Sequence, residues 1–301
     1  MRKIGKTDPS SPKERNFALK SGDIKSLIKE NWLTLAFCLT VIIAVLTRTV
    51  FALGTSLGDG IALSGSSATE HKHTIISILT GTFGLSDPSL NYPLGGTLMQ
   101  PPLVDMILAG FAWLPMALGV SASTAAAGVL ALSGPVAAAA TVLVIYYLGK
   151  EMFDRNIGII AAFLFAVMPL SVVMSVFSDG TTMGVLVLFF ALASLFMFRA
   201  MKALEATESR RLEAVLSKDI LQYVLGAGFM FALIALSWNG FSMIVVLLVF
   251  MMAGHAVVSR LNSQDFGSAF GAYAIMILMT LLISLPYYYA AGLFTLVFTG
   301  P

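Results

Sequence analysis

The chain has 301 residues, of which 57% are hydrophobic and only 11% are charged. Soluble globular domains carry about 25% charged residues, so this composition excludes an ordinary soluble domain and indicates that lipid surrounds most of the surface. The formal net charge of +2 carries little information by itself, and no nucleic-acid partner is expected.

The chain begins with a polar, basic segment, residues 1–31, which does not have the character of a cleaved signal peptide. The apolar run after it is too long for a signal h-region and lacks a clear small-residue cleavage site. We therefore expect a cytoplasmic segment at 1–31 and a transmembrane domain over 32–301. Cys38 is the single cysteine and lies in the first apolar run, which excludes a disulfide within the chain.

Apolar runs of about 20 residues, long enough to cross a bilayer as helices, recur along the chain. A first outer loop, 54–102, is rich in Gly, Ser and Pro, with a short helix expected near Ser66–Leu79. The next segment, Leu103–Val120, is ambiguous because it carries Asp105 early and Pro115 late. The expected spans are Trp32–Leu53, Ala125–Leu148, Ile157–Phe177, Thr182–Met201, Ile220–Trp238, Phe241–Val258 and Ala269–Leu285.

The distribution of positive charge decides whether Leu103–Val120 is counted as a transmembrane span. If it does not cross, all of the 18 Lys and Arg residues except Arg48 and Lys72 lie on one side, which the positive-inside rule identifies as cytoplasmic. We therefore predict an all-α polytopic membrane protein with about seven transmembrane helices, a cytoplasmic N-terminus, and an interfacial or re-entrant helix in the outer loop. The outer side then carries a mildly acidic set: Asp59, Glu70, Asp87, Asp105 and Asp179.

Asp179 is the first candidate for chemistry. It lies at an outer helix end, so Asp179 or Thr181 could simply cap the helix that begins near Thr182. The functional alternative is a carboxylate at the membrane interface that holds a divalent cation or a polar head group, since hard cations prefer oxygen ligands.

Glu70, His71 and His73 form the second candidate, a metal cluster in the first outer loop. On a helix, positions i and i+2 point to different faces, so a solvated polar segment is the alternative. Trp238 lies at an outer helix end and is explained by interfacial anchoring. Arg48, near another outer end, could bind a lipid phosphate or extend to the interface.

The order of these features resembles that of the N-terminal half of the catalytic subunit of oligosaccharyltransferase in its archaeal form, a C-type (GT-C) glycosyltransferase. The likeness runs from about Arg48 to Gly240. The matching segments are Gly60–Gly65, Tyr92–Gly95, Pro101–Asp105, Tyr147–Phe153, Gly158–Ala162, Met168–Leu170, Phe198–Ala200 and Leu236–Gly240, with Asp179 at the start of the second acidic motif.

The resemblance implies transfer of a polyprenyl-linked oligosaccharide to a protein asparagine, with Mn²⁺ or Mg²⁺ neutralising the pyrophosphate leaving group. It makes Asp179 the catalytic residue and a metal ligand, with Glu70 or Asp59 as a compensating ligand. Ser67 and Thr181 stand where the family has further ligands, so two ligand positions lack a carboxylate or histidine. Arg48, His71 and Trp238 are the expected substrate-binding residues.

The family's later spans and its soluble WWDYG domain are not found in these 301 residues, so acceptor recognition is expected from a further domain or a partner subunit. The alternative is a non-catalytic membrane module that binds a lipid-linked sugar or a partner subunit. A transporter or channel is disfavoured, because ionisable residues inside the spans are nearly absent.

Overall fold

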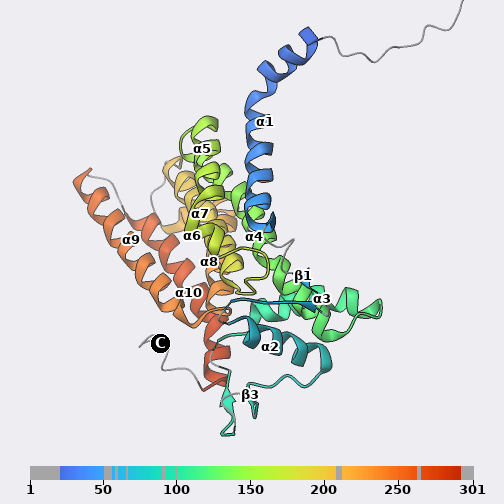
Figure 1. Cartoon of the computed structure of the whole chain (residues 1–301). Coiled ribbons are helices and arrows are strands. Elements are labelled where there is room, and N and C mark those ends of the chain that lie inside the picture. Colours follow the sequence, from blue (N-terminus) through green and yellow to red (C-terminus); the bar gives the residue numbers. More distant parts are fainter. Residues whose placement is uncertain are drawn as a thin grey trace, which may run out of the picture.

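In the part of the chain that the computed structural model describes, six helices are long and apolar enough to cross a membrane. The structure describes residues 21–50, 56–57, 60–65, 67–89, 93–98, 100–207, 212–262 and 266–292. The six helices are α1 (Ser21–Thr49), α4 (Ala122–Met152), α7 (Met183–Glu205), α8 (Lys218–Ala235), α9 (Ser242–Leu261) and α10 (Gly267–Ala290), and they pack into one bundle (Figure 1).

The segment expected as one span at Ile157–Phe177 is divided in two. Helix α5 (Arg155–Val167) ends where Pro169 begins the short helix α6 (Pro169–Val173). Proline has no amide hydrogen and pushes the residue before it out of the helical region, so α5 cannot continue. At about 1.5 Å per residue α5 is about 20 Å long, which is less than the hydrocarbon core, and the prediction of an unbroken helix is wrong.

The first outer loop folds against one end of the bundle (Figure 1). Helix α2 (Ala68–Thr80) confirms the short helix expected there, and α3 (Leu103–Ala117) packs beside it. Two antiparallel hairpins complete this end: β1 (Ser56–Leu57) with β2 (Gly60–Ile61), and β3 (Ser86–Asp87) with β4 (Gly96–Thr97). Helix α3 begins beside the outer end of α8, where the amide of Leu103 donates to the carbonyl of Leu236, and with 15 residues it is shorter than the helices that could cross a membrane.

The two ends of the bundle differ in charge. The end formed by the starts of α1, α5 and α8 carries most of the described basic residues, among them Lys150, Arg155, Arg199, Lys202, Lys218 and Arg260, whereas Arg48 and Lys72 lie toward the opposite end. The opposite end, where α2 and α3 lie (Figure 1), carries Glu70, Asp87, Asp105 and Asp179. The helical arrangement therefore produces the separation of charge that the sequence predicted.

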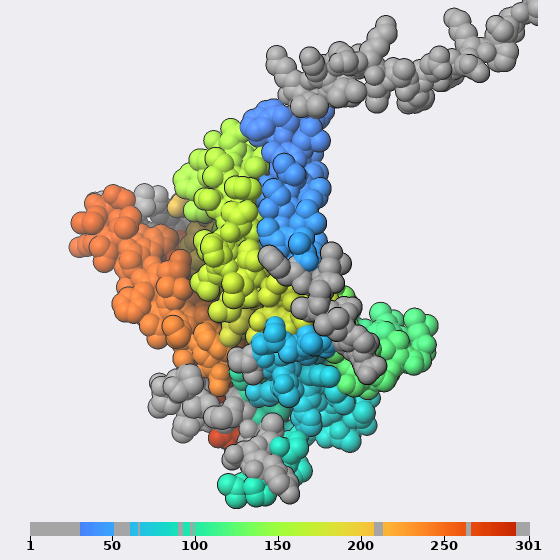
Figure 2. Space-filling view, viewed as in Figure 1, coloured from blue at the N-terminus to red at the C-terminus, as the bar shows by residue number. Residues whose placement is uncertain are grey.

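Helix α4 lies at the centre and contacts neighbours on several sides. Small residues permit these contacts: a Cβ on Gly149 would lie 2.9 Å from the Cα of Gly158 in α5. A second core joins α7, α8 and α10, where Phe231 and Met276 are buried. Helix α9, after the short 3-10 helix η3 (Asn239–Phe241), forms an edge of the bundle (Figure 2), and few of its side chains are buried. Another 3-10 helix, η2 (Leu212–Leu216), precedes α8.

Candidate functional site

The loop between α6 and α7 pairs with the first outer loop. The amide of Ser64 donates to the carbonyl of Ser178 at 2.8 Å, and that of Gly65 donates to the carbonyl of Asp179 at 2.7 Å. A Cβ on Gly65 would lie 2.0 Å from that carbonyl oxygen, so this close approach requires glycine. The two loops that the family resemblance assigns to one site therefore meet.

The backbone of this loop is held in an uncommon conformation. Ser178 has φ 72°, in the left-handed region that non-glycine residues rarely adopt. Its amide donates to the carbonyl of Ala131 in α4 at 3.3 Å, and its hydroxyl donates to the carbonyl of Ala62. Such strain persists only where the surroundings fix the backbone. These contacts hold the neighbouring Asp179 in a defined position.

Asp179 is half-buried, and its carboxylate accepts a hydrogen bond from the Thr181 hydroxyl. Neither residue caps the next helix: the N-cap of α7 is Thr182, and no side chain caps it. The capping explanation for Asp179 is therefore wrong. The carboxylate lies beside the paired loops at the outer end of the bundle.

The described residues do not fit a bound Mn²⁺ or Mg²⁺. No group of three or more His, Cys, Asp or Glu side chains that could hold a metal ion lies in the described part of the chain. Ser67, at the start of α2, offers only a hydroxyl, and Glu70 is half-buried without a hydrogen bond or ion pair in that same part. Asp59, the other acid considered for compensation, lies outside the described residues. Hard cations need several oxygen ligands, which Asp179 alone does not supply.

His71 forms a buried pair with Asp105, an acid that sequence reasoning assigned only to membrane orientation. The Nδ1 of His71 lies 2.9 and 3.1 Å from the two carboxylate oxygens, and both residues are 5% exposed. On the other side of the ring, Nε2 lies 3.5 Å from the hydroxyl of Thr182. Three elements, α2, α3 and the start of α7, are thereby joined through one imidazole.

The buried environment of Asp105 shifts the pKa of its carboxyl group. Burial raises the pKa of Asp105, and the hydrogen bond from His71 opposes that shift. With Nδ1 donating to the carboxylate, Nε2 of a neutral His71 is the acceptor facing Thr182. A signal was present in the sequence: an acid in the first turn of the apolar segment Leu103–Val120 needs a buried partner.

The proposed cluster of Glu70, His71 and His73 does not form. His73 turns away from His71, and its Nε2 lies 2.7 Å from the carboxylate of Asp87 in β3. Ser89 completes this second group, because its hydroxyl and amide both donate to Asp87. The pKa of Asp87 is lowered to about 2, mainly by the hydrogen bonds from Ser89 and His73. The group ties the β3–β4 hairpin to α2.

Arg48 is fully buried at the break between α5 and α6. Its guanidinium donates to the hydroxyls of Ser175 and Ser171, each at 2.7 Å, and to the carbonyls of Ala166 at 2.9 Å and Ala44 at 3.0 Å. The carbonyl of Ala166 lies at the end of α5, where the helix hydrogen bonds stop. These contacts give Arg48 a role in the fold, and the expected contact with a lipid phosphate stays a prediction.

Trp238 lies in the turn after α8, half-buried against the core of α7, α8 and α10. A Cβ on Gly240 would come within 2.3 Å of its ring, so glycine is needed beneath it. The preceding turn reaches the candidate site, because the amide of Leu103 donates to the carbonyl of Leu236 at 3.0 Å. The substrate-binding role expected of Trp238 stays a prediction.

Comparison with known proteins gives structural likeness only. No family model matches the chain, and no curated protein matches it by sequence. The Archaeoglobus fulgidus oligosaccharyltransferase AglB, solved with an inhibitory peptide and a dolichol-phosphate, superposes with a TM-score of 0.73 at 19% identity, over 86% of this chain and 30% of AglB. The apo form of the enzyme from the same organism gives a TM-score of 0.71 at 18% identity, over 88% of this chain and 30% of the other.

A third similar structure is the Saccharomyces cerevisiae protein O-mannosyltransferase Pmt1–Pmt2 complex bound to its sugar donor. It gives a TM-score of 0.58 at 17% identity, over 88% of this chain and 34% of the other. The chain thus has the fold of the N-terminal transmembrane half of a C-type glycosyltransferase and spans about 30% of the length of the solved oligosaccharyltransferases. This confirms the fold that the sequence predicted.

Proposed function

We propose that this chain is the donor-binding transmembrane part of an oligosaccharyltransferase-like glycosyltransferase, which transfers a polyprenyl-linked oligosaccharide to a protein asparagine. The observation that supports it most is the likeness to AglB, whose structure holds a dolichol-phosphate and a peptide. The paired loops at Gly65 and Asp179 add to this support, because they build a defined polar surface at one membrane face.

In this proposal the phosphate end of the donor lies at the outer end of the bundle, near Asp179. The donor's isoprenoid chain lies in the bilayer alongside the spans. The fixed carboxylate of Asp179 can accept hydrogen bonds from sugar hydroxyls or from an acceptor amide. The described ligand set does not fit Mn²⁺ or Mg²⁺, so no step is assigned to a metal, and the cation requirement becomes part of the test.

Two further parts of the proposal concern the surroundings of the chain. The N-terminal side faces the cytoplasm, as the positive-inside rule predicts for its lysines and arginines. Acceptor binding comes from a further domain or a partner subunit, since the matched region is about 30% of the solved enzyme.

The test is a transfer assay on the purified chain in lipid nanodiscs, together with any downstream domain or partner subunit that co-purifies. A radiolabelled polyprenyl-linked oligosaccharide is supplied with an acceptor peptide, in Mn²⁺ or in EDTA. We expect transfer that Asp179→Ala abolishes and that Asp219→Ala, an acid at the other end of the bundle, preserves. Binding of the donor without turnover would support the non-catalytic module, and no binding would refute the proposal.

A further inference from the structure

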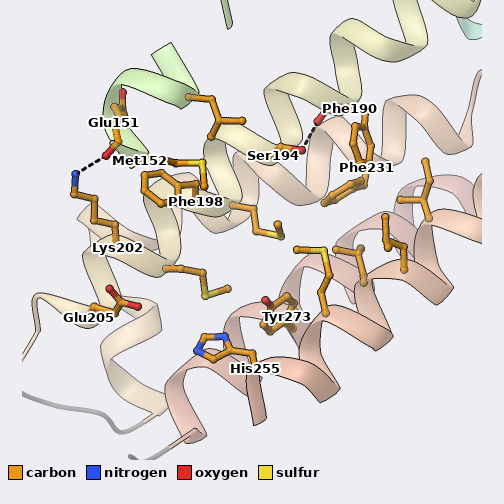
Figure 3. A pocket seen from close by; sticks show the side chains of 17 residues that line it. Glu151, Met152, Phe190, Ser194, Phe198, Lys202, Glu205, Phe231, His255 and Tyr273 are labelled. Carbon is orange, nitrogen blue, oxygen red and sulfur yellow. Dashed lines mark hydrogen bonds between the residues drawn. The ribbon is translucent and has the colours of Figure 1, made fainter. Parts of the chain in front are cut away.

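A cavity of about 730 Å³ lies between α7 and α9, away from the paired loops (Figure 3). It extends from the middle of α7 to that helix's C-terminal end. Helices α4, α8 and α10 each contribute to its wall, with Phe231 from α8 and Tyr273 from α10. Its size is within the range of about 300–1,000 Å³ that is typical of small-molecule sites.

Two facing stripes of side chains form the long walls. On α7 the stripe includes Phe190, Met197 and Met201, and on α9 it includes Ile244 and Met251. The spacings of four and seven residues place each set on one helix face. Methionine side chains adapt to ligands of irregular shape, so these walls suit a flexible apolar chain.

The charged side chains that line the cavity lie at one end. Lys202 and Glu205 on α7, His255 on α9 and Glu151 on α4 line it at the end that carries the basic residues (Figure 3). Glu151 is already neutralised by a bidentate pair with Arg199, whose Nε lies 3.0 and 3.2 Å from its two oxygens.

Among the described residues that line this end, Lys202 and Glu205 are the remaining charged side chains. Within the described residues, the Nζ of Lys202 donates to the backbone carbonyl of Glu151 at 3.3 Å, and Glu205 has no ion pair. Both side chains are exposed. A head group carrying a phosphate beside a primary ammonium would complement both charges at once.

The length of the apolar part matches one leaflet of a bilayer. From Phe190 to Met201 an α-helix rises about 16 Å at about 1.5 Å per residue. Half of a hydrocarbon core of about 30 Å is about 15 Å. A lipid whose head group lies at Lys202 would therefore place its acyl chains along the apolar walls.

We propose that this cavity binds one phospholipid with a phosphate and a primary ammonium in its head group, taken from the leaflet on the N-terminal side. The phosphate lies at Lys202 and the ammonium at Glu205, with acyl chains between α7 and α9. The head group lies at the opposite end of the bundle from Asp179, so this lipid is not the sugar donor. The site is independent of the proposed function.

The test is native mass spectrometry of the purified full chain with phosphatidylethanolamine, phosphatidylglycerol or phosphatidylcholine supplied singly. We expect one molecule of phosphatidylethanolamine to be retained about tenfold more strongly than either other lipid, because among the three only its head group offers Glu205 a charged N–H donor. Ser194→Trp should fill the cavity and remove this retention, whereas Ala253→Trp, an exposed α9 position outside the lining, should leave it unchanged.

Two exposed substitutions keep the test decisive if Ser194→Trp fails to fold. Lys202→Ala should weaken retention of all three lipids, and Glu205→Gln should remove the preference for phosphatidylethanolamine over phosphatidylglycerol. Equal retention of the three lipids by the native chain would overturn the proposal. A co-purifying protein that excludes them all, or full retention in a correctly folded Ser194→Trp variant, would also overturn it.

Discussion

The buried pair of His71 and Asp105 should be a major support of the outer end of the bundle. Asp105→Ala removes the carboxylate that lies 2.9 Å from Nδ1 and leaves a buried ring nitrogen without a partner. An unsatisfied buried polar group costs about 1–3 kcal/mol, and lost packing adds to this, so we expect a total of about 3 kcal/mol. Asp105→Asn keeps an acceptor oxygen and should cost about 1 kcal/mol.

The assay is thermal unfolding of the detergent-solubilised chain. A loss of about 3 kcal/mol should lower the melting temperature by about 6 °C or more. The double variant His71→Ala/Asp105→Ala should cost less than the sum of the single changes, because the two residues interact directly. Glu70→Ala, on the same helix as His71, serves as the control and should change little. The proposed role of the pair would be wrong if the losses of stability in His71→Ala and Asp105→Ala simply added in the double variant. It would also be wrong if Asp105→Ala were as stable as the native chain.

The pH dependence has a definite sign. Burial raises the pKa of Asp105 above its unfolded value, so the folded state binds its proton more tightly. The stability of the native chain relative to Asp105→Asn should therefore be highest below pH 4 and should fall as pH rises through the raised pKa. If the stabilities of the native chain and of Asp105→Asn change in parallel from pH 4 upward, the burial of this acid is contradicted.

Three other perturbations test separate contacts. Hydrogen bonds lower the pKa of Asp87 to about 2, so the ionised carboxylate should stabilise the hairpin above pH 4 and lose this effect as pH falls through about 2. Hydrogen exchange of the amides near His73 should show this pH dependence in the native chain and lack it in Asp87→Asn. Gly65→Ala forces a Cβ to 2.0 Å from a carbonyl oxygen and should abolish the stable fold, whereas Gly110→Ala, which meets open space, should leave the melting temperature within about 2 °C. Arg48→Lys keeps the charge but loses the planar fork of donors, and should cost at least about 2 kcal/mol by thermal unfolding.

The sequence predicted the spans because lipid imposes one strong condition, an apolar run of sufficient length. The sequence also predicted the separation of charge. If Leu103–Val120 does not cross the membrane, nearly all Lys and Arg residues lie on one side, as the positive-inside rule requires. Pro169 was visible, yet a window of hydropathy does not respond to a missing amide hydrogen, so Ile157–Phe177 was expected as one helix. The break appears only when the backbone hydrogen bonds are followed.

The site was less predictable, because its contacts join residues far apart in the chain. Asp105 and His71 belong to different helices of the first outer loop, and no local pattern relates them. The role of Arg48 depends on the carbonyl of Ala166, which the α5–α6 break exposes, so it could not be predicted while that segment was expected as one helix. The expectation that Asp179 shares a site with the first outer loop rested on the family resemblance, because no local sequence pattern predicted it.

The central claim is that a polyprenyl-linked sugar donor binds with its phosphate end at the paired loops. The most direct measurement is photocrosslinking of the chain in nanodiscs with a polyprenyl-phosphate sugar that carries a diazirine on its first sugar, followed by peptide mapping. The account predicts adducts in the loop around Asp179 and in α2, competed by unlabelled donor. Adducts confined to the opposite end of the bundle, or adducts that excess donor does not reduce, would contradict it.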